Sequence, residues 1–548
     1  MENEFLTKYP DVRTIRSKRG HLYVHPADPF LRESILRGIE LEEQFVFVRT
    51  DILRLPTYGE DSLGKPDTTE ADEVSQAYGD TFAAVLKRLE KSGKPRIWVL
   101  ESWMTNNREY WTQERVKKAL SFFPKDLPLV IWDLKAEQEP LYEYHNGWHG
   151  QKWAFMSCLN MGMMGFPVGD VHNLLSRAYQ IRTGSCFAEN CIGFGVFPEH
   201  RDYSPLYFEL GYKLAWNPVS VDLRSFLREY AVRRYGAENA RQMIPVLQTM
   251  VDTVYGPNLQ PMMSGGFRDT VQICPRYFHA IGPQWSGYPQ LDDKARMNAA
   301  SREFFIPRLT WGLEQALTVS DNLRGEPAYE RDLVDIGRSL LHALFNSETM
   351  RMYDAFQAGD KKAFQAHASL MRQSLDWIYE LVSCLDNRHE YSVSALLKQY
   401  RQVPWGKSEK AVKHHVLYVT FSGKQITEYH RADWAEVVRD FYRPRVEASL
   451  NVFLNLLRQG ETQIEPHKKS FDAAREGIAD RFLDTPLVPP RSKFGSAVEA
   501  SNALLKWVKR TGVLDVASES YIGTARTNVK DEADWWNKDT SEGVYKEE

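Results

Sequence analysis

The stretch LPLVIWDL at residues 127–134 decides the fold class of the first part of the chain. Its apolar residues are consecutive rather than alternating, which is typical of a strand covered on both faces. Helix-like segments at 71–91 and 112–122 flank it on the N-terminal side. Similar runs, rich in Val, Ile, Phe and Trp, are QFVFV (45–49), RIWVL (96–100), KWAFMSCLN (152–160) and CIGFGVF (191–197). This alternation predicts βαβ units and a parallel sheet up to Trp216.

From residue 217 onward the strand-like signal nearly disappears, and we expect an α-helical domain over 217–511. Apolar residues recur at helical spacing, with Pro444 in a first helical turn and Gly460 at a helix end. One exception is 414–429, which predicts a short hairpin turning at Ser422-Gly423. The expected helices include 295–322, 332–345, 361–386, 445–459 and 497–510. The fold class is therefore α/β followed by all-α.

Composition restricts the class of protein. The 548 residues are 43% hydrophobic and 26% charged, which is ordinary for a soluble globular chain. The net charge of -4 excludes a generally basic nucleic-acid binder. No apolar run approaches the roughly 18–20 residues that span a bilayer, so we expect no membrane partner. The N-terminus shows no signal peptide, and the acidic stretch 512–548 is expected to be a loosely attached tail.

Carboxylates that follow the apolar runs are candidates for chemistry, because ligands bind at the carboxyl ends of parallel strands. They are Glu60, Glu101, Asp133, Glu137 and Glu199. A pair of them could serve as acid/base and nucleophile in glycoside hydrolysis. The alternative is that they are helix caps, loop charges or salt-bridge partners.

Metal binding is not favoured. His145 and His149 are four residues apart without an obvious third ligand, and Cys186 and Cys191 lack a second pair. Five cysteines, an odd and small number, imply no disulfide framework. We expect no metal ion and no cofactor.

The order of several motifs resembles the α-N-acetylglucosaminidases, glycoside hydrolase family 89. The most specific motif is IGFGVFPEHRDYSPLYFELGYKLAW at 192–216. It is preceded by WVLESWMTNNREYW (98–111), LVIWDLKAEQEPLY (129–142) and GQKWAFMSCLNMG (150–162), and a weaker match follows at 420–445. The resemblance covers about residues 10–460.

This resemblance implies a retaining exo-glycosidase that removes terminal α-linked N-acetylglucosamine from a glycan or glycosaminoglycan. It also implies a (β/α)8 TIM-type barrel followed by an all-α domain. Family members are lysosomal or secreted, but the compartment of this chain stays open.

The family's site residues carry over position by position. Its nucleophile, in a Gly-x-Gly-x-x-Pro-Glu motif, corresponds to Glu199. Its acid/base, in an Asp-x-Phe-Asn-Glu stretch, corresponds to Glu60 in Pro-Thr-Tyr-Gly-Glu, where Asp and Asn are replaced. Retention predicts that the two carboxyl groups lie about 5–5.5 Å apart. The pocket residues implied are Trp103, Asn160, Phe421, which stands where the family has Trp, and Tyr429.

Only 60 residues lead up to and include Glu60, which in the family lies midway round the barrel. We therefore expect residues 1–216 to form a partial barrel that lacks its first βα units. An unclosed sheet leaves an exposed edge, which favours association with a second copy. The competing interpretation is a catalytically inactive, truncated relative that binds carbohydrate or serves as a scaffold.

Overall fold

The computed structural model divides into two compact units, each described by itself. The sheet unit comprises Met1–Leu159, His172–Pro198 and Phe208–Val221, and the helical unit comprises Asn160–Val171, Glu199–Tyr207 and Asp222–Glu548. The structure describes residues 2–17, 20–45, 52–54, 63, 68–91, 97–123, 128–134, 136–158, 165, 167–184, 187–198, 204–216, 221–256, 303–402, 408–418, 421–422, 425–426 and 433–514.

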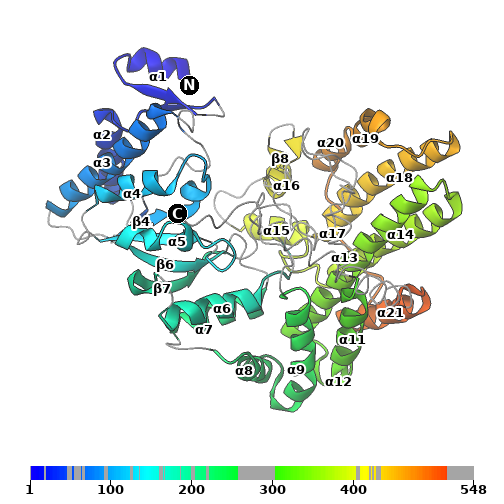
Figure 1. Ribbon diagram of the computed structural model, residues 1–548. Helices are drawn as coiled ribbons and strands as arrows, with labels where there is room; N and C mark the ends of the chain where they lie inside the picture. Colours follow the sequence, from blue (N-terminus) through cyan, green and yellow to red (C-terminus); the bar gives the residue numbers. More distant parts are fainter. Residues whose placement is uncertain are drawn as a thin grey trace. The chain divides into compact units, whose positions relative to one another are not determined.

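The sheet unit is built on five parallel strands in the order β3-β4-β5-β6-β7. The strands are β3 (Ile52–Arg54), β4 (Ile97–Glu101), β5 (Leu129–Leu134), β6 (Lys152–Ser157) and β7 (Cys191–Val196). Helices connect successive strands (Figure 1), namely α3 (Thr69–Lys91), α4 (Gln113–Ser121), α5 (Leu141–Tyr144) and α6 (Val171–Arg182), and α7 (Pro205–Trp216) follows β7. Sequential order with parallel pairing is what repeated βαβ units produce.

Four of the five predicted strands are confirmed within a few residues. The first is displaced: Phe45 is the last residue of α2 (Pro29–Phe45), and the strand lies at Ile52–Arg54. Residues 46–50 lie outside the described part of the chain. Before α2, the chain forms α1 (Glu2–Lys8) and a hairpin of β1 (Thr14–Arg16) and β2 (Leu22–Val24), which the sequence did not predict.

Helices dominate the helical unit, as predicted. The longest helix, α13 (Pro327–Gln357), begins at Pro327, where a proline costs no hydrogen bond. It packs extensively on α14 (Lys361–Ser383). The others are α8 (Leu223–Tyr235), α9 (Ala237–Asp252), α11 (Phe305–Leu317), α12 (Ser320–Leu323), α15 (Val393–Tyr400), α16 (Glu409–Tyr418), α17 (Ala435–Val437), α18 (Arg443–Arg458), α19 (Lys468–Arg475), α20 (Ile478–Asp484) and α21 (Ala497–Arg510).

The predicted ends of α18 are confirmed. Pro444 lies in its first turn, and Gly460 follows it with φ 79°. The Glu461 N–H donates to the carbonyl of Leu456 at 2.9 Å, and the Gly460 N–H donates to that of Leu457 at 3.2 Å. This Schellman arrangement satisfies carbonyls that the helix end would leave unpaired.

The predicted hairpin at 414–429 is shorter than expected. Residues 414–418 belong to α16, and the strands are only β8 (Phe421–Ser422) and β9 (Gln425–Ile426), which pair antiparallel. The apolar residues from Val416 onward suggested a strand, whereas 414–418 continue a helix that begins at Glu409. Tertiary contacts hold the earlier part of this helix: Val412 and Lys413 are buried, and the Lys413 ammonium donates to the carbonyl of Phe482 at 2.9 Å.

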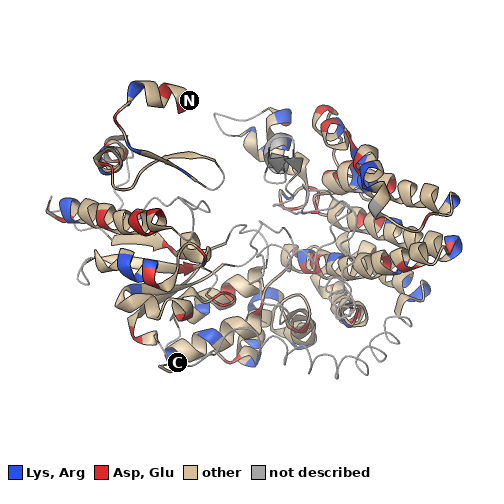
Figure 2. Ribbon diagram, turned by 45° about the horizontal axis from the view of Figure 1, so that its top comes forward, with Lys and Arg blue, Asp and Glu red and all other residues tan. Residues whose placement is uncertain are grey.

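Lys and Arg residues are interspersed with Asp and Glu residues along the described helices (Figure 2). Among these helices, none is both long and apolar enough to cross a bilayer.

Candidate functional site

The strand register assigns side chains to the two faces of the sheet. Paired residues of parallel strands point to the same side, and successive residues alternate. We call one side the Trp132 face; it carries Val99, Glu101, Val130, Trp132, Leu134, Ala154 and Met156. We call the other the Asp133 face; it carries Trp98, Leu100, Leu129, Ile131, Asp133, Trp153 and Phe155. On the Asp133 face, Leu129, Ile131 and Trp153 are fully buried.

The Trp132 face is partly exposed and aromatic. Leu134, Ala154 and Met156 form a small apolar cluster, against which Trp103, Trp132 and Phe197 pack while remaining partly accessible. The rings of Trp132 and Phe197 lie 6.3 Å apart at 62°. Trp103 belongs to the turn Ser102–Asn106, directly after β4. Flat rings at the carboxyl edge of a parallel sheet are suited to a ligand with apolar faces, such as a sugar.

Glu101 is the described carboxylate of the Trp132 face. It ends β4, is 5% exposed and accepts a hydrogen bond from the guanidinium of Arg54 on β3. Burial raises the pKa of the Glu101 carboxyl above its ordinary value, and the ion pair with Arg54 opposes that rise. The position fits a group that faces a ligand at the strand ends.

Asp133 and Glu137 are fully buried instead. The Asp133 carboxyl accepts hydrogen bonds from the backbone N–H of Tyr142 and, at 3.3 Å, from the indole N–H of Trp148. Burial raises the pKa of Asp133 well above its ordinary range. Since Tyr142 lies in α5, Asp133 holds the start of that helix against the sheet. It is a structural acid, so its inclusion among the carboxylates that could do chemistry is not supported.

Most of the site predicted from the resemblance falls outside the described residues. Glu60, Asn160, Glu199 and Tyr429 all lie there, so the predicted separation of the two glutamates stays a prediction. Phe421 begins strand β8, where its backbone pairs with Ile426. Among the predicted site residues, Trp103 alone is described with its side chain, which packs on the Trp132 face directly after β4.

The two histidines weighed as metal ligands lie in an unusual turn. Residues 146–150 all have positive φ, between 47° and 85°. His145 precedes this turn, is fully buried and has no hydrogen-bond partner for either ring nitrogen among the described residues. Burial, together with smaller contributions from His149 and Arg108, lowers the pKa of His145 to about 3. Within the described ranges, no three His, Cys, Asp or Glu side chains gather as a metal site would require. The sequence feature that could have predicted this left-handed turn is Asn146-Gly147 followed by Gly150, in HNGWHG.

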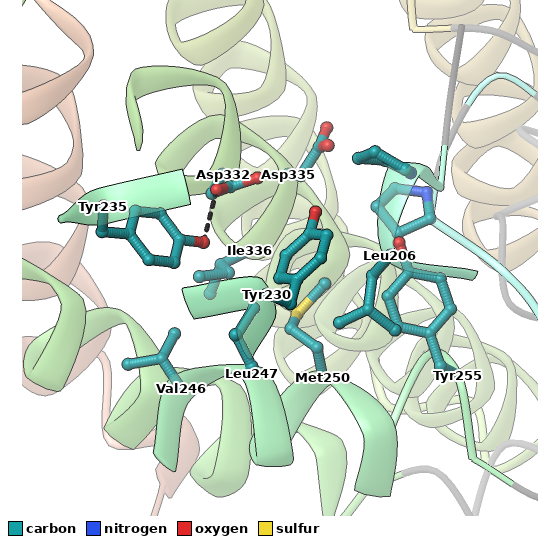
Figure 3. Close-up of a pocket in the computed structure, with 12 residues that line it drawn as sticks. Leu206, Tyr230, Tyr235, Val246, Leu247, Met250, Tyr255, Asp332, Asp335 and Ile336 are labelled. Carbon is teal, nitrogen blue, oxygen red and sulfur yellow. Dashed lines mark hydrogen bonds between the residues drawn. The ribbon is translucent and has the colours of Figure 1, made fainter. Parts of the chain in front are cut away.

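The described residues also line cavities that include no residue of the Trp132 face. The helical unit holds one of about 30 Å³, lined by Asp332, Asp335 and three tyrosines (Figure 3). In Figure 3 the hydroxyl of Tyr235 points to Asp332, to which it donates at 2.6 Å. This volume holds about one water molecule and is too small for a sugar. The sheet unit has a groove of about 450 Å³ between α3 and α4, and none of the described residues that line it is aromatic.

Comparisons with known proteins agree with this geometry. The family model for the alpha-N-acetylglucosaminidase tim-barrel domain matches residues 11–218, and that for the C-terminal domain matches residues 226–506. The alpha-N-acetylglucosaminidase of Homo sapiens is 21% identical over 511 residues, which cover 88% of this chain and 61% of that protein.

Solved structures of a family 89 glycoside hydrolase from Clostridium perfringens have the same fold. One complex contains 2-acetamido-1,2-dideoxynojirmycin. Another is a variant with two Glu→Gln substitutions, in complex with its substrate GlcNAc-alpha-1,4-galactose. Each has a TM-score of 0.68 and 17% identity, and each match covers 92% of this chain and 55% of the bacterial one. The chain thus spans about three fifths of the human relative and about half of the bacterial one.

Proposed function

This chain belongs to the alpha-N-acetylglucosaminidase family, glycoside hydrolase family 89, and on that premise we propose that it removes terminal α-linked N-acetylglucosamine from glycans with retention of configuration. The observation that carries the proposal is the Trp132 face. Trp103, Trp132 and Phe197 supply partly exposed rings at the carboxyl edge of the sheet, next to the buried Glu101.

The proposed catalytic pair is Glu199 and Glu60. Glu199 lies two positions after Phe197 and three after the end of β7, so it follows the carboxyl end of that strand in sequence. The bacterial relative was captured with its substrate after two glutamates were changed to glutamine, which supports a mechanism that depends on two carboxyl groups.

In the first step, Glu60 donates its proton to the glycosidic oxygen while the carboxylate of Glu199 attacks the anomeric carbon. The bond from that carbon to the leaving oxygen breaks, and a glycosyl ester on Glu199 forms. In the second step, Glu60 takes a proton from water, the water oxygen attacks the anomeric carbon, and Glu199 leaves as carboxylate. Two inversions give net retention.

The test is the release of nitrophenol from an aryl α-N-acetylglucosaminide. Glu199→Gln should abolish turnover, whereas Asp133→Asn, at a carboxylate on the opposite face, should not. Glu60→Gln should lower the rate about 10²–10⁴-fold on a disaccharide. The loss should be smaller on the aryl substrate, because nitrophenol needs little protonation to leave.

Product analysis by NMR should detect the α-anomer first. A first-formed β-anomer would exclude retention, and turnover that survives Glu199→Gln would exclude the nucleophile. Sugar binding without turnover, unchanged by Glu199→Gln, would support an inactive carbohydrate-binding relative instead.

A further inference from the structure

A buried ionic group lies on the helix α13, within the helical unit. Asp335, Arg338 and His342 occupy successive turns and are nearly inaccessible to solvent. The Arg338 guanidinium contacts Asp335 through Nη2 at 2.7 Å and Nε at 3.0 Å. Its Nη1 donates to the carbonyl oxygen of Gly165 at 2.7 Å. One side chain thus joins α13 to the chain between β6 and α6.

The chain around Gly165 is held at further points in the same unit. The Val168 N–H donates to the hydroxyl of Ser204 at 3.1 Å, and that hydroxyl donates to the Val168 carbonyl at 3.2 Å. The Val171 N–H donates to the carbonyl of Tyr255 at 3.0 Å. In sequence, Gly165 follows Asn160 by five positions and Ser204 follows Glu199 by five.

The same group holds the chain at the start of α17. Asp433 is buried, and its Oδ2 lies 2.7 Å from Nε2 of His342 and 3.8 Å from Nη1 of Arg338. Asp433 follows the predicted sugar-contacting Tyr429 by four positions.

Two further hydrogen bonds connect the segment at Asp433 back to Asp335 through Tyr391. The Ala435 N–H donates to the Tyr391 carbonyl at 2.9 Å, and the Tyr391 hydroxyl donates to Asp335 at 3.0 Å. The segment 433–436 is therefore fixed to α13 directly and through Tyr391.

Buried ion pairs add little stability compared with apolar side chains of the same size, because both charges lose their hydration. Arginine, unlike lysine, can hold several acceptors at once in a fixed planar geometry. Arg338 contacts acceptors from two segments far apart in sequence, at Gly165 and Asp433. This arrangement indicates that Arg338 fixes the geometry of the two segments rather than adding stability.

We propose that Arg338 is a positioning residue that fixes the segment at Gly165 and the segment at Asp433 on a single helix. In sequence, these segments follow Asn160 and Tyr429, which the family resemblance assigns to the sugar pocket. The catalytic consequence rests on the proposed glycosidase function, whereas the anchoring itself does not.

Amide hydrogen exchange of the full chain tests the anchoring. In Arg338→Lys the charge remains, but a single nitrogen replaces the three that contact Asp335 and the Gly165 carbonyl. Amides in 165–171 should exchange about tenfold faster or more, because a lost hydrogen bond to a charged group changes a local opening equilibrium by about that factor. Amides in 433–436 should also exchange faster, because the ion pair between Arg338 and Asp433, 3.8 Å apart, is disturbed. The matched control is Arg234→Lys, since Arg234 bonds Asp332 at 2.7 Å through two nitrogens and neither segment provides its partners.

Exchange as slow as in the wild type in either segment, or equal acceleration in Arg234→Lys, would overturn the proposal. If Arg338→Lys does not fold, Asp335→Asn takes its place, because it removes the charge that orients Arg338. The same two segments should then exchange faster, and unchanged exchange would again overturn the proposal.

Kinetics test the consequence for catalysis. Misplacing a site residue by about 1 Å can lower the rate about 10²-fold, so Arg338→Lys should lose about that factor in kcat/KM while its thermal midpoint stays near that of Arg234→Lys. An unchanged kcat/KM in Arg338→Lys would refute the positioning role. A wild type without turnover would refute the proposed function, and the exchange data would still decide the anchoring.

Discussion

Trp148 donates its indole N–H to the carboxyl of Asp133 at 3.3 Å, on the face of the sheet opposite Trp132. This bond identifies Asp133 as part of the packing beneath the sheet. Its neighbour in sequence, Trp132, belongs to the partly exposed face that we assign to the sugar.

Removing the Asp133 side chain should therefore affect stability rather than activity. In Asp133→Ala, the N–H groups of Tyr142 and Trp148 lose a buried acceptor, which should lower the free energy of unfolding by about 1–3 kcal/mol. Asp133→Asn keeps an acceptor and resembles the protonated acid, so it should cost less. Urea unfolding measures both changes. A loss of activity per folded molecule in Asp133→Asn would contradict this role.

The Glu101 carboxyl should give a stability effect that depends on pH. Because burial raises its pKa in the folded state, the folded protein holds a proton at pH values where the unfolded chain has released it. This contribution is complete at low pH and is lost as pH rises past the ordinary value of the carboxyl.

Glu101→Gln imitates the protonated form at every pH. Its free energy of unfolding relative to wild type should therefore increase between pH 4 and pH 7, as chemical denaturation at a series of pH values can measure. A decrease over that range would mean that the ion pair with Arg54 outweighs burial.

His145 should make the protein sensitive to acid. Its pKa is lowered to about 3 in the folded state, so the unfolded chain binds a proton first as pH falls. The stability present at neutral pH is lost between about pH 6.5 and pH 3. From pH 7 to pH 4.5 this loss is about 2–3 kcal/mol for His145 alone.

His145→Phe should remove that part of the pH dependence, because the ring packs beside Trp148 and neither nitrogen has a partner among the described residues. The matched control is His172→Phe, at an exposed position of α6. An acid profile of His145→Phe identical to wild type would show that the imidazole is not the cause.

The left-handed turn at 146–150 should depend on Gly147. Its φ is 61°, and an added Cβ would lie 2.8 Å from Cβ of Phe187. Gly147→Ala combines a backbone cost of about 1–2 kcal/mol with this clash. Gly184→Ala, at φ 82° with no described atom within 4 Å of an added Cβ, carries the backbone cost alone. Thermal unfolding should rank Gly147→Ala as the less stable variant, and equal stabilities would contradict the clash.

Sequence reasoning reached the architecture because the signals for it are local. Consecutive apolar runs such as LPLVIWDL predicted the parallel strands, and the helical spacing of Leu333, Ile336 and Leu340 predicted α13. Gly460 indicated a helix end because a left-handed residue is required there. The wrong prediction was equally local: the apolar residues from Val416 onward favour a strand, but 414–418 continue α16, in which Val412 and Lys413 are buried.

The sequence by itself determined the order of strands and helices and the motif that carries Glu199. Only the tertiary structure decided that Glu101 shares a face with Trp132 while Asp133 points to the opposite one. The physical reason is that strands covered on both faces are apolar throughout, so their sequence indicates neither how neighbouring strands align nor which side meets which layer. Likewise, the spacing of apolar residues around Arg338 predicts a helix but does not indicate that Arg338 is buried. Its buried position depends on Gly165 and Asp433, which are distant in sequence and contact it only after folding.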